Sequence, residues 1–415
     1  MAAAAKSPRR RLAARALGFL AVSGPGFLVM LADTDAGNIV TAAQGGAQWG
    51  YRLLPLVLAL IPILYLLQEI TVRLGIYTGR GFTELIRERF GAGWAWLSLA
   101  GLAAATMGSL VTELTGVAGV GELYGVSRSI TLPLAAAALL AIVASGSYRR
   151  AERAGIAIGS FLLAFFAVLW AAHPNLNTMA RQMADLPLTN RNFLFMTAAI
   201  IGMTLNPWMV FYQQSAIAEK KLQPGDYVAA RWETAAGAVL TQLLSGAVLI
   251  SVASLLLPKT RAMLTSVGEI SGALTPVFGE QAGRAAFGLG VLGGSMAAAL
   301  VSSLALAWGA GETIGHRRAQ NSRPFETAWF HGAYAAAVAT SAVLVWSEPD
   351  LVWLNIGAQV LNAFLLPLVI GLLLALGARA LPEPLRLRGW RLWLIVGIST
   401  ALCSAGFLGG LSGML

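Results

Sequence analysis

The sequence is poor in cysteine, histidine and charge. Its 415 residues include one cysteine and three histidines, and only 12% of them are charged. A single cysteine, Cys403, cannot form a disulfide within the chain, so it gives no indication of the redox compartment. There is also no metal-ligand histidine pair, nucleophile elbow or phosphate loop, which argues against an enzyme and predicts no resident cofactor. Ordinary soluble domains have roughly 25% charged residues, so that class is excluded.

Hydrophobic residues make up 57% of the chain. This composition predicts a polytopic membrane protein, because about 20 apolar residues span the hydrocarbon of a bilayer. About eleven such segments recur, at 17–42, 53–72, 94–123, 129–147, 155–172, 193–217, 232–257, 284–311, 327–346, 351–377 and 391–413.

The basic residues indicate the orientation of these spans. About three quarters of the 29 lysines and arginines fall in the N-terminal tail, 1–16, and in every second loop after it. Positive loops face the cytoplasm, so we predict an inner-membrane protein with a cytoplasmic N-terminus and an outer C-terminus. The N-terminal apolar run has no convincing cleavage site, which favours a first helix over a signal peptide. Because the arginines are spread over all the inner loops, no nucleic-acid partner is expected.

The first span contains the polar stretch Leu31–Gln44, LADTDAGNIVTAAQ. Acidic residues inside a membrane are costly and indicate a functional site. We expect the helix to break at Ala36-Gly37, freeing backbone carbonyls, with Asp35 and Asn38 aimed into a cavity. A structural role, in which a buried partner satisfies Asp35, is the alternative.

The sixth span carries a second helix-breaking sequence. Pro207 follows Asn206 in the middle of the segment, so carbonyls near Met203 should lose their helical donors. A simple proline kink is the alternative. Two interrupted spans, five apart, are typical of inverted-repeat transporters whose site lies at the midplane. The predicted organisation is a first five-helix repeat over 17–172, an inverted second repeat over 193–377, and one additional helix over 391–413.

Other polar residues within the spans have two open interpretations each. Asp33 either lines the approach or contacts the ion, and Glu113 is either a proton acceptor or a packing residue. Gln359 and Asn362, three positions apart on one helix face, either line the pathway or join helices by hydrogen bonds. The oxygen ligands of this set suit hard divalent ions such as Mg²⁺, Ca²⁺ or Mn²⁺.

Several motifs together resemble the NRAMP divalent-metal transporters. They are GPGF at 24–27, DAGN at 35–38, Gln44, GAQWGY at 46–51, QEITVRLGIYTGRG at 68–81, Glu113, the run from Gly202 to Pro207, and Gln359. The resemblance covers nearly the whole chain. It implies an all-α membrane protein with about eleven helices, a LeuT-like fold, and helices one and six broken. It also implies Asp35, Asn38, Asn206 and the carbonyls of Ala32 and Met203 as the metal ligands.

The chain departs from the family motifs at several positions. Ala36 replaces the proline of Asp-Pro-Gly-Asn, Asn206 the motif methionine and Trp208 the motif histidine. The family's second histidine appears as Gln213 or Gln214, and its second acid in the third helix as Gly116. These replacements resemble the NRAMP-related magnesium transporter branch. A lost thioether favours harder ions, because soft sulfur ligands select softer metals.

We therefore predict a monomeric, alternating-access transporter of Mg²⁺, and also of Mn²⁺, without proton coupling. A proton-coupled Mn²⁺/Fe²⁺ symporter, with Glu113 as the proton acceptor, is the nearest alternative. An amino-acid or amine transporter on the same fold is the alternative of another class. In such a transporter the positive N-terminal end of a broken-helix segment would attract the carboxylate of the substrate.

Overall fold

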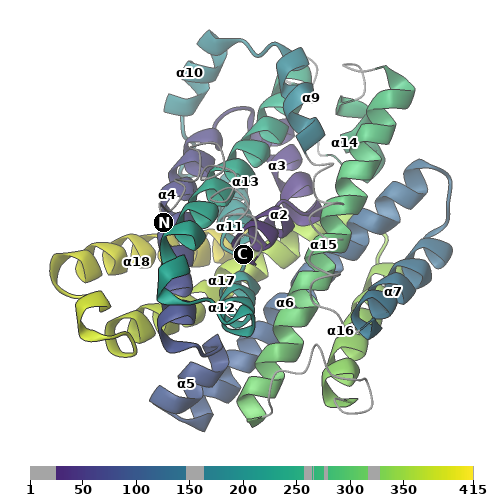
Figure 1. The fold of residues 1–415 in the computed structure, drawn as a ribbon. Coiled ribbons are helices and arrows are strands. Elements are labelled where there is room, and N and C mark those ends of the chain that lie inside the picture. Colours follow the sequence, from purple (N-terminus) through teal and green to yellow (C-terminus); the bar gives the residue numbers. More distant parts are fainter. Residues whose placement is uncertain are drawn as a thin grey trace, which may run out of the picture.

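The computed structural model describes residues 25–145, 163–256, 264, 266–274, 279–315 and 328–414. The predicted tail 1–16 and the first half of the fifth predicted span lie outside these residues. The described part is helical and contains no strand (Figure 1).

The first half of the chain supplies both segments of a broken helix and four further main helices. They are α2 (Pro25–Asp33), α3 (Ala36–Trp49), α4 (Leu54–Thr78), α6 (Ala92–Leu123), α7 (Arg128–Ala144) and α9 (Ala164–Ala172). The second half repeats this order with α11 (Arg191–Thr204), α12 (Pro207–Lys220), α13 (Tyr227–Leu256), α15 (Glu280–Ile314), α16 (Ala328–Ser347) and α17 (Leu351–Arg379), and α18 (Gly389–Met414) follows.

Short helices join some of these elements. They are α5 (Phe82–Phe90), α10 (Leu176–Ala184), α14 (Val267–Leu274), η2 (Pro224–Asp226) and η5 (Glu383–Leu385). The sequence did not predict them, because a helix of about nine residues gives a weak periodic signal. Seven helical segments of the described part are long and apolar enough to cross a membrane. The α2–α3 pair, α7, α9 and α16 stand at the positions of the other four predicted spans.

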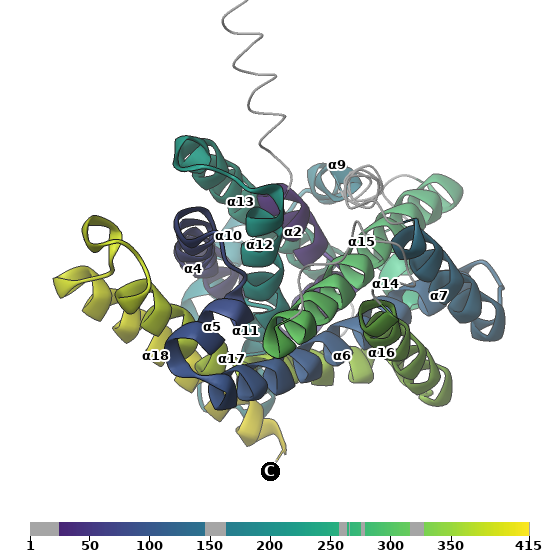
Figure 2. The same ribbon diagram turned by 60° about the horizontal axis from the view of Figure 1, so that its bottom comes forward.

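The broken helices lie at the centre of the bundle. The long helix α6 packs along α15, and α4 packs along α13 (Figures 1 and 2). Helices α3 and α11 contact each other and α17, while α18 packs at the edge against α11 and α17. Polar residues of both breaks are buried among these helices, so the fold places them away from lipid.

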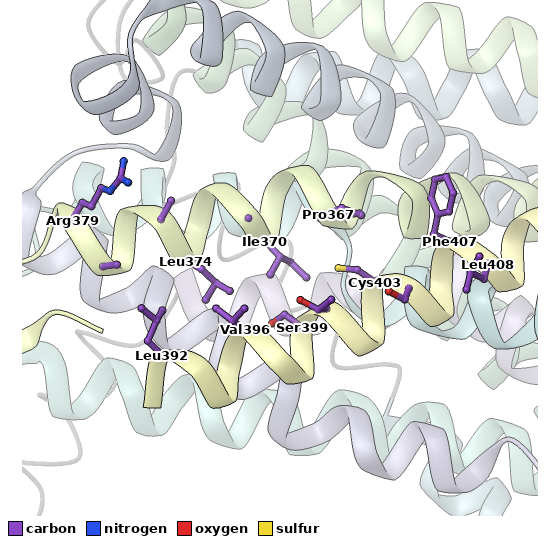
Figure 3. A pocket seen from close by; sticks show the side chains of 15 residues that line it. Pro367, Ile370, Leu374, Arg379, Leu392, Val396, Ser399, Cys403, Phe407 and Leu408 are labelled. Atoms are coloured by element: carbon purple, nitrogen blue, oxygen red, sulfur yellow. The ribbon is translucent and has the colours of Figure 1, made fainter. Parts of the chain in front are cut away.

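An apolar groove of about 680 Å³ runs between α17 and α18 (Figure 3). Its lining includes Ile370, Leu374 and Val396, and Arg379 stands at one end. None of the predicted site residues lines it. The groove is therefore separate from the broken helices.

Candidate metal site

The first break lies between α2 and α3. Asp35 has an extended backbone, with φ −88° and ψ −176°, and its Oδ1 accepts a 2.7 Å hydrogen bond from the Asn38 amide. Asp is a strong N-cap residue, so α3 begins directly after it. The predicted break at Ala36-Gly37 is therefore wrong: both residues belong to the first turn of α3, and the interruption lies at Thr34-Asp35.

The second break lies between α11 and α12, where the sequence predicted it. Helix α11 ends at Thr204, and Pro207 is the first residue of α12. Proline lacks an amide hydrogen, so the carbonyl of Met203, four residues earlier, has no helical donor at position 207. The irregular backbone is confined to Leu205 and Asn206.

The carbonyl of Ala32 also lacks its helical donor. In a continuous helix it would accept from the Ala36 amide. That amide instead donates a 3.2 Å hydrogen bond to Oε2 of Glu113 on α6. The two backbone carbonyls predicted as ligands thus stand at equivalent places, one at each break. Their role as ligands stays a prediction.

Asn38 braces the first break. Its Nδ2 donates to the Asp33 carbonyl at 2.9 Å, and its Oδ1 accepts from Ser245 Oγ on α13 at 2.6 Å. One lone pair of this oxygen remains for a cation. The sequence missed Ser245, because nothing local in α13 marks one serine among several.

Asp35 and Glu113 form a buried pair of acids. Their carboxyl groups lie within hydrogen-bonding reach of each other, and both side chains are fully buried. Glu113 Oε1 also accepts from Thr112 Oγ1 at 3.0 Å. Asp35 Oδ2 receives no hydrogen bond from the described residues. Two adjacent carboxylates repel each other, so this pair is a place where a cation or a shared proton is favoured.

Asn206 lies at the end of a hydrogen-bonded chain. Trp208 Nε1 donates to Ser109 Oγ at 2.7 Å, and Ser109 Oγ donates to Asn206 Oδ1 at 3.2 Å. Asn362 Nδ2 donates to the same oxygen at 2.7 Å. Sequence reasoning missed Ser109, although it lies one helical turn before Glu113 and shares its face.

Helix α17 closes the site on a third side. Asn362 Nδ2 also donates to Gln359 Oε1, on the same helix, at 3.0 Å. Its bond to Asn206 joins α17 to the break before α12, so Asn362 does join helices by a hydrogen bond. The Gln359 amide lies against α3, where a methyl group at position 37 would be 2.1 Å from its Nε2. Gly202 allows a similar approach, since a methyl group there would lie 1.8 Å from the Gln359 carbonyl oxygen. Glycines therefore allow α17 to approach both broken helices.

Asp33 is the least satisfied residue of the region. Its side chain is fully buried, and neither carboxylate oxygen has a hydrogen-bond partner among the described residues. A buried, unpaired carboxylate is costly, which makes Asp33 a candidate for contact with a cation.

The atoms at the breaks that could bind a metal ion are oxygens. The described residues contain no group of three His, Cys, Asp or Glu side chains with metal-site geometry. The available ligands are instead carboxylates, amide oxygens and backbone carbonyls. This set suits a hard divalent cation better than a soft metal.

Comparison with known proteins agrees with this arrangement. A family model described as Nramp, natural resistance-associated macrophage protein-like, matches residues 26–409. This chain belongs to the Nramp family. The resemblance seen in the sequence motifs is thereby confirmed. Nramp proteins are membrane transporters, so the chain is a transporter and not an enzyme.

Curated relatives of this Nramp protein include the divalent metal cation transporter MntH of Burkholderia ambifaria. It is 29% identical over 406 residues, covering 92% of this chain and 88% of the relative. The MntH of Yersinia pestis is 26% identical over 296 residues, covering 69% and 71% of the two chains.

Solved structures show the same fold as this Nramp protein. The Eremococcus coleocola manganese transporter superposes with a TM-score of 0.74 at 19% identity, covering 95% of this chain and 88% of that one. The nucleobase-cation symporter Mhp1 superposes with a TM-score of 0.59 at 17% identity, covering 94% and 90%. The predicted LeuT-like architecture with broken first and sixth helices is confirmed.

Proposed function

We propose that this Nramp protein carries divalent metal cations by alternating access, prefers Mg²⁺, also accepts Mn²⁺, and works without proton coupling. Its relatives include a divalent metal cation transporter and a manganese transporter, which supports the divalent class. The observation that carries the proposal is that Asp35 Oδ2, at the break between α2 and α3, receives no hydrogen bond from the described residues. Asp35, Asn38, Asn206 and the carbonyls of Ala32 and Met203 are the proposed ligands.

Unpaired oxygens around the breaks support a hydrated ion. Both carboxylate oxygens of Asp33 and the Oδ1 of Asn362 are buried and receive no hydrogen bond from the described residues. Water bound to a cation points its hydrogens outward, so these oxygens can accept hydrogen bonds from it. Mg²⁺ sheds water reluctantly and usually keeps several water ligands. A site with spare oxygen acceptors therefore suits Mg²⁺ that keeps part of its water.

Three replacements support transport without protons. A side chain at Gly116 would place its Cβ 2.3 Å from the Ala36 Cβ and 2.5 Å from Ser295 Oγ, so an acid does not fit there. The indole of Trp208, where the family motif has histidine, donates a hydrogen bond but does not take up a proton. Gln213 and Gln214 do not titrate either, and they bind Thr234 and the Arg80 carbonyl.

One observation favours a second candidate, a proton-coupled Mn²⁺/Fe²⁺ symporter. The buried carboxyl groups of Asp35 and Glu113 lie within hydrogen-bonding reach, and one shared proton would satisfy both. In this candidate Glu113 takes up the proton when the metal enters.

Uptake into liposomes that contain a metal-sensitive dye and a pH-sensitive dye separates the two candidates. We expect the parent protein to admit Mg²⁺ and Mn²⁺ without proton entry. Asp35→Asn retains a good N-cap for α3 but removes the charge, so it should fold normally and lose uptake. Proton entry that accompanies the metal would favour the second candidate. Uptake by Asp35→Asn equal to the parent would contradict the assigned site.

The proposed location is the inner membrane, with the N-terminus cytoplasmic, the C-terminus outside and the protein a monomer. The ends of α4, α12 and α17, near Gly79, Lys221 and Arg379, would then face the cytoplasm. We call this side the basic end. The membrane potential then drives cation entry, by about 2.3 kcal/mol per charge for each 100 mV.

A further inference from the structure

A cavity of about 760 Å³ lies at the basic end, between α4, the start of α13 and the connection from α17 to α18. We call it the basic pocket. Its charged and phenolic lining residues are Tyr65, Glu69, Arg73, Tyr227, Arg231, Arg386, Arg388 and Arg391. Its lining residues on α18 include Arg391 and Leu394, whereas Leu392 and Val396 of the same helix line the groove of Figure 3. The two cavities therefore use different faces of α18.

Only part of the positive charge in the basic pocket is neutralised. Glu69 forms a 2.7 Å ion pair with Arg73 and accepts a hydrogen bond from the Tyr227 hydroxyl. Glu383, next to the pocket, lies 3.1 Å from Arg388 and 3.7 Å from Arg386. Two acids thus face five arginines.

Arg231 and Arg391 have no acidic partner within ion-pair distance in the described part of the chain. Arg231 Nε donates to the Tyr65 hydroxyl at 2.8 Å, which fixes its direction. The Arg391 guanidinium lies 5.9 Å from the centre of the Trp390 ring. A guanidinium held in this way still has free N–H groups, and it matches the geometry of a phosphate.

The surface beside the basic pocket is apolar. Trp390 is 71% exposed, Trp393 73% and Leu394 51%, all on the first turns of α18. Tryptophan is enriched where a membrane meets water. A ligand in this pocket would therefore meet arginines at one end and exposed apolar side chains of α18 at the other.

We propose that the basic pocket binds the phosphate headgroup of an anionic phospholipid, whose acyl chains lie along α18. Basic pockets between transmembrane helices on the cytoplasmic side hold headgroups of this class. The groove of Figure 3 offers no such cluster of charge, because Arg379 is its one charged lining residue.

Bound lipid would tie the edge of the protein to the helices that hold the site. Arg73 Nη1 already donates to the Leu385 carbonyl at 3.1 Å, linking α4 to η5. Arg231 lies on α13, the helix whose Ser245 holds Asn38. A phosphate bridging Arg231 and Arg391 would therefore hold α13 against the start of α18.

The test measures cardiolipin binding to the purified full-length protein in detergent, by native mass spectrometry and by thermal stability. Arg231→Gln and Arg391→Gln each remove one charge from the pocket, and both positions are exposed, so the variants should fold. Arg89→Gln removes an exposed arginine of α5 outside the pocket and is the matched control. We expect about fivefold weaker binding for each pocket variant and no change for the control.

Phosphatidylethanolamine and glycerol phosphate distinguish the sources of the phosphate. We expect cardiolipin to raise the melting temperature of the parent and neither of the other compounds to do so. Equal stabilisation by phosphatidylethanolamine would overturn the charge-based site. Binding of glycerol phosphate as tight as that of cardiolipin would assign the pocket to a soluble anion. A loss of cardiolipin binding in Arg89→Gln equal to that in the pocket variants would show that general surface charge is responsible. Either result overturns the lipid site.

Discussion

The backbone amide of Ala36 donates a 3.2 Å hydrogen bond to Oε2 of Glu113, which joins the first turn of α3 to α6. The family motif that this stretch resembles has proline at the position of Ala36. Proline has no amide hydrogen, so it could not make this bond. The replacement therefore supplies a donor for a buried acid beside Asp35.

Ala36→Pro should destabilise the protein by removing this donor. Proline is tolerated as the first residue of a helix, and the extended backbone of Asp35 is compatible with a following proline. A lost bond to a charged acceptor costs about 1.5–3 kcal/mol, so we expect a lower melting temperature. Ala36→Gly keeps the amide and is the control. A proline variant at least as stable as the glycine variant would show that the bond contributes nothing.

Asn206→Met should shift selectivity towards Mn²⁺. The change replaces an amide oxygen at the break with a thioether, and soft ligands favour transition metals. It also leaves Ser109 and Asn362 without their shared acceptor. Isothermal titration of parent and variant with Mg²⁺ and Mn²⁺ measures the effect. We expect the ratio of Mn²⁺ to Mg²⁺ affinity to rise, and an unchanged ratio would remove Asn206 from the selectivity determinants.

Gly202→Ala should disrupt the contact between α11 and α17. The added methyl group would lie 1.8 Å from a backbone oxygen of Gln359, so the two helices must separate. Overpacking of this kind typically costs about 1–3 kcal/mol. Gly357→Ala lies on α17 with no atom within 4 Å of the new methyl group, so it should keep its stability and uptake. If both variants melt like the parent, the close approach is not needed.

Asp33→Asn tests the unpartnered acid. If Asp33 contacts the ion, losing its charge should weaken Mg²⁺ binding about tenfold, as for other interactions with a charged group. We expect this weakening, measured by titration, together with a higher melting temperature, because a buried charge without a partner is removed. A variant that is more stable but binds Mg²⁺ with unchanged affinity would show that Asp33 lowers stability without contacting the ion.

Much of this architecture could be predicted from the sequence. Apolar length located the spans, and Asn206-Pro207 located the second break, because proline removes a donor wherever it stands. The first break was predicted two residues too late. Gly37 suggests a break at its own position, whereas the N-cap preference of Asp35 determines where α3 starts. The short helices α5, α10 and α14 were not predicted, because so few residues give only a weak periodic signal.

The sequence by itself determined the membrane class, the family, the two interrupted helices and the oxygen chemistry of their polar residues, because each follows from local composition and motifs. Only the tertiary structure decided which groups meet. Ser245 reaches Asn38 across 207 positions of the chain, and Asn362 reaches Asn206 across 156. Such contacts depend on how helices pack, so the stretch around Asp35 could predict the presence of a site but not the residues that hold it in place.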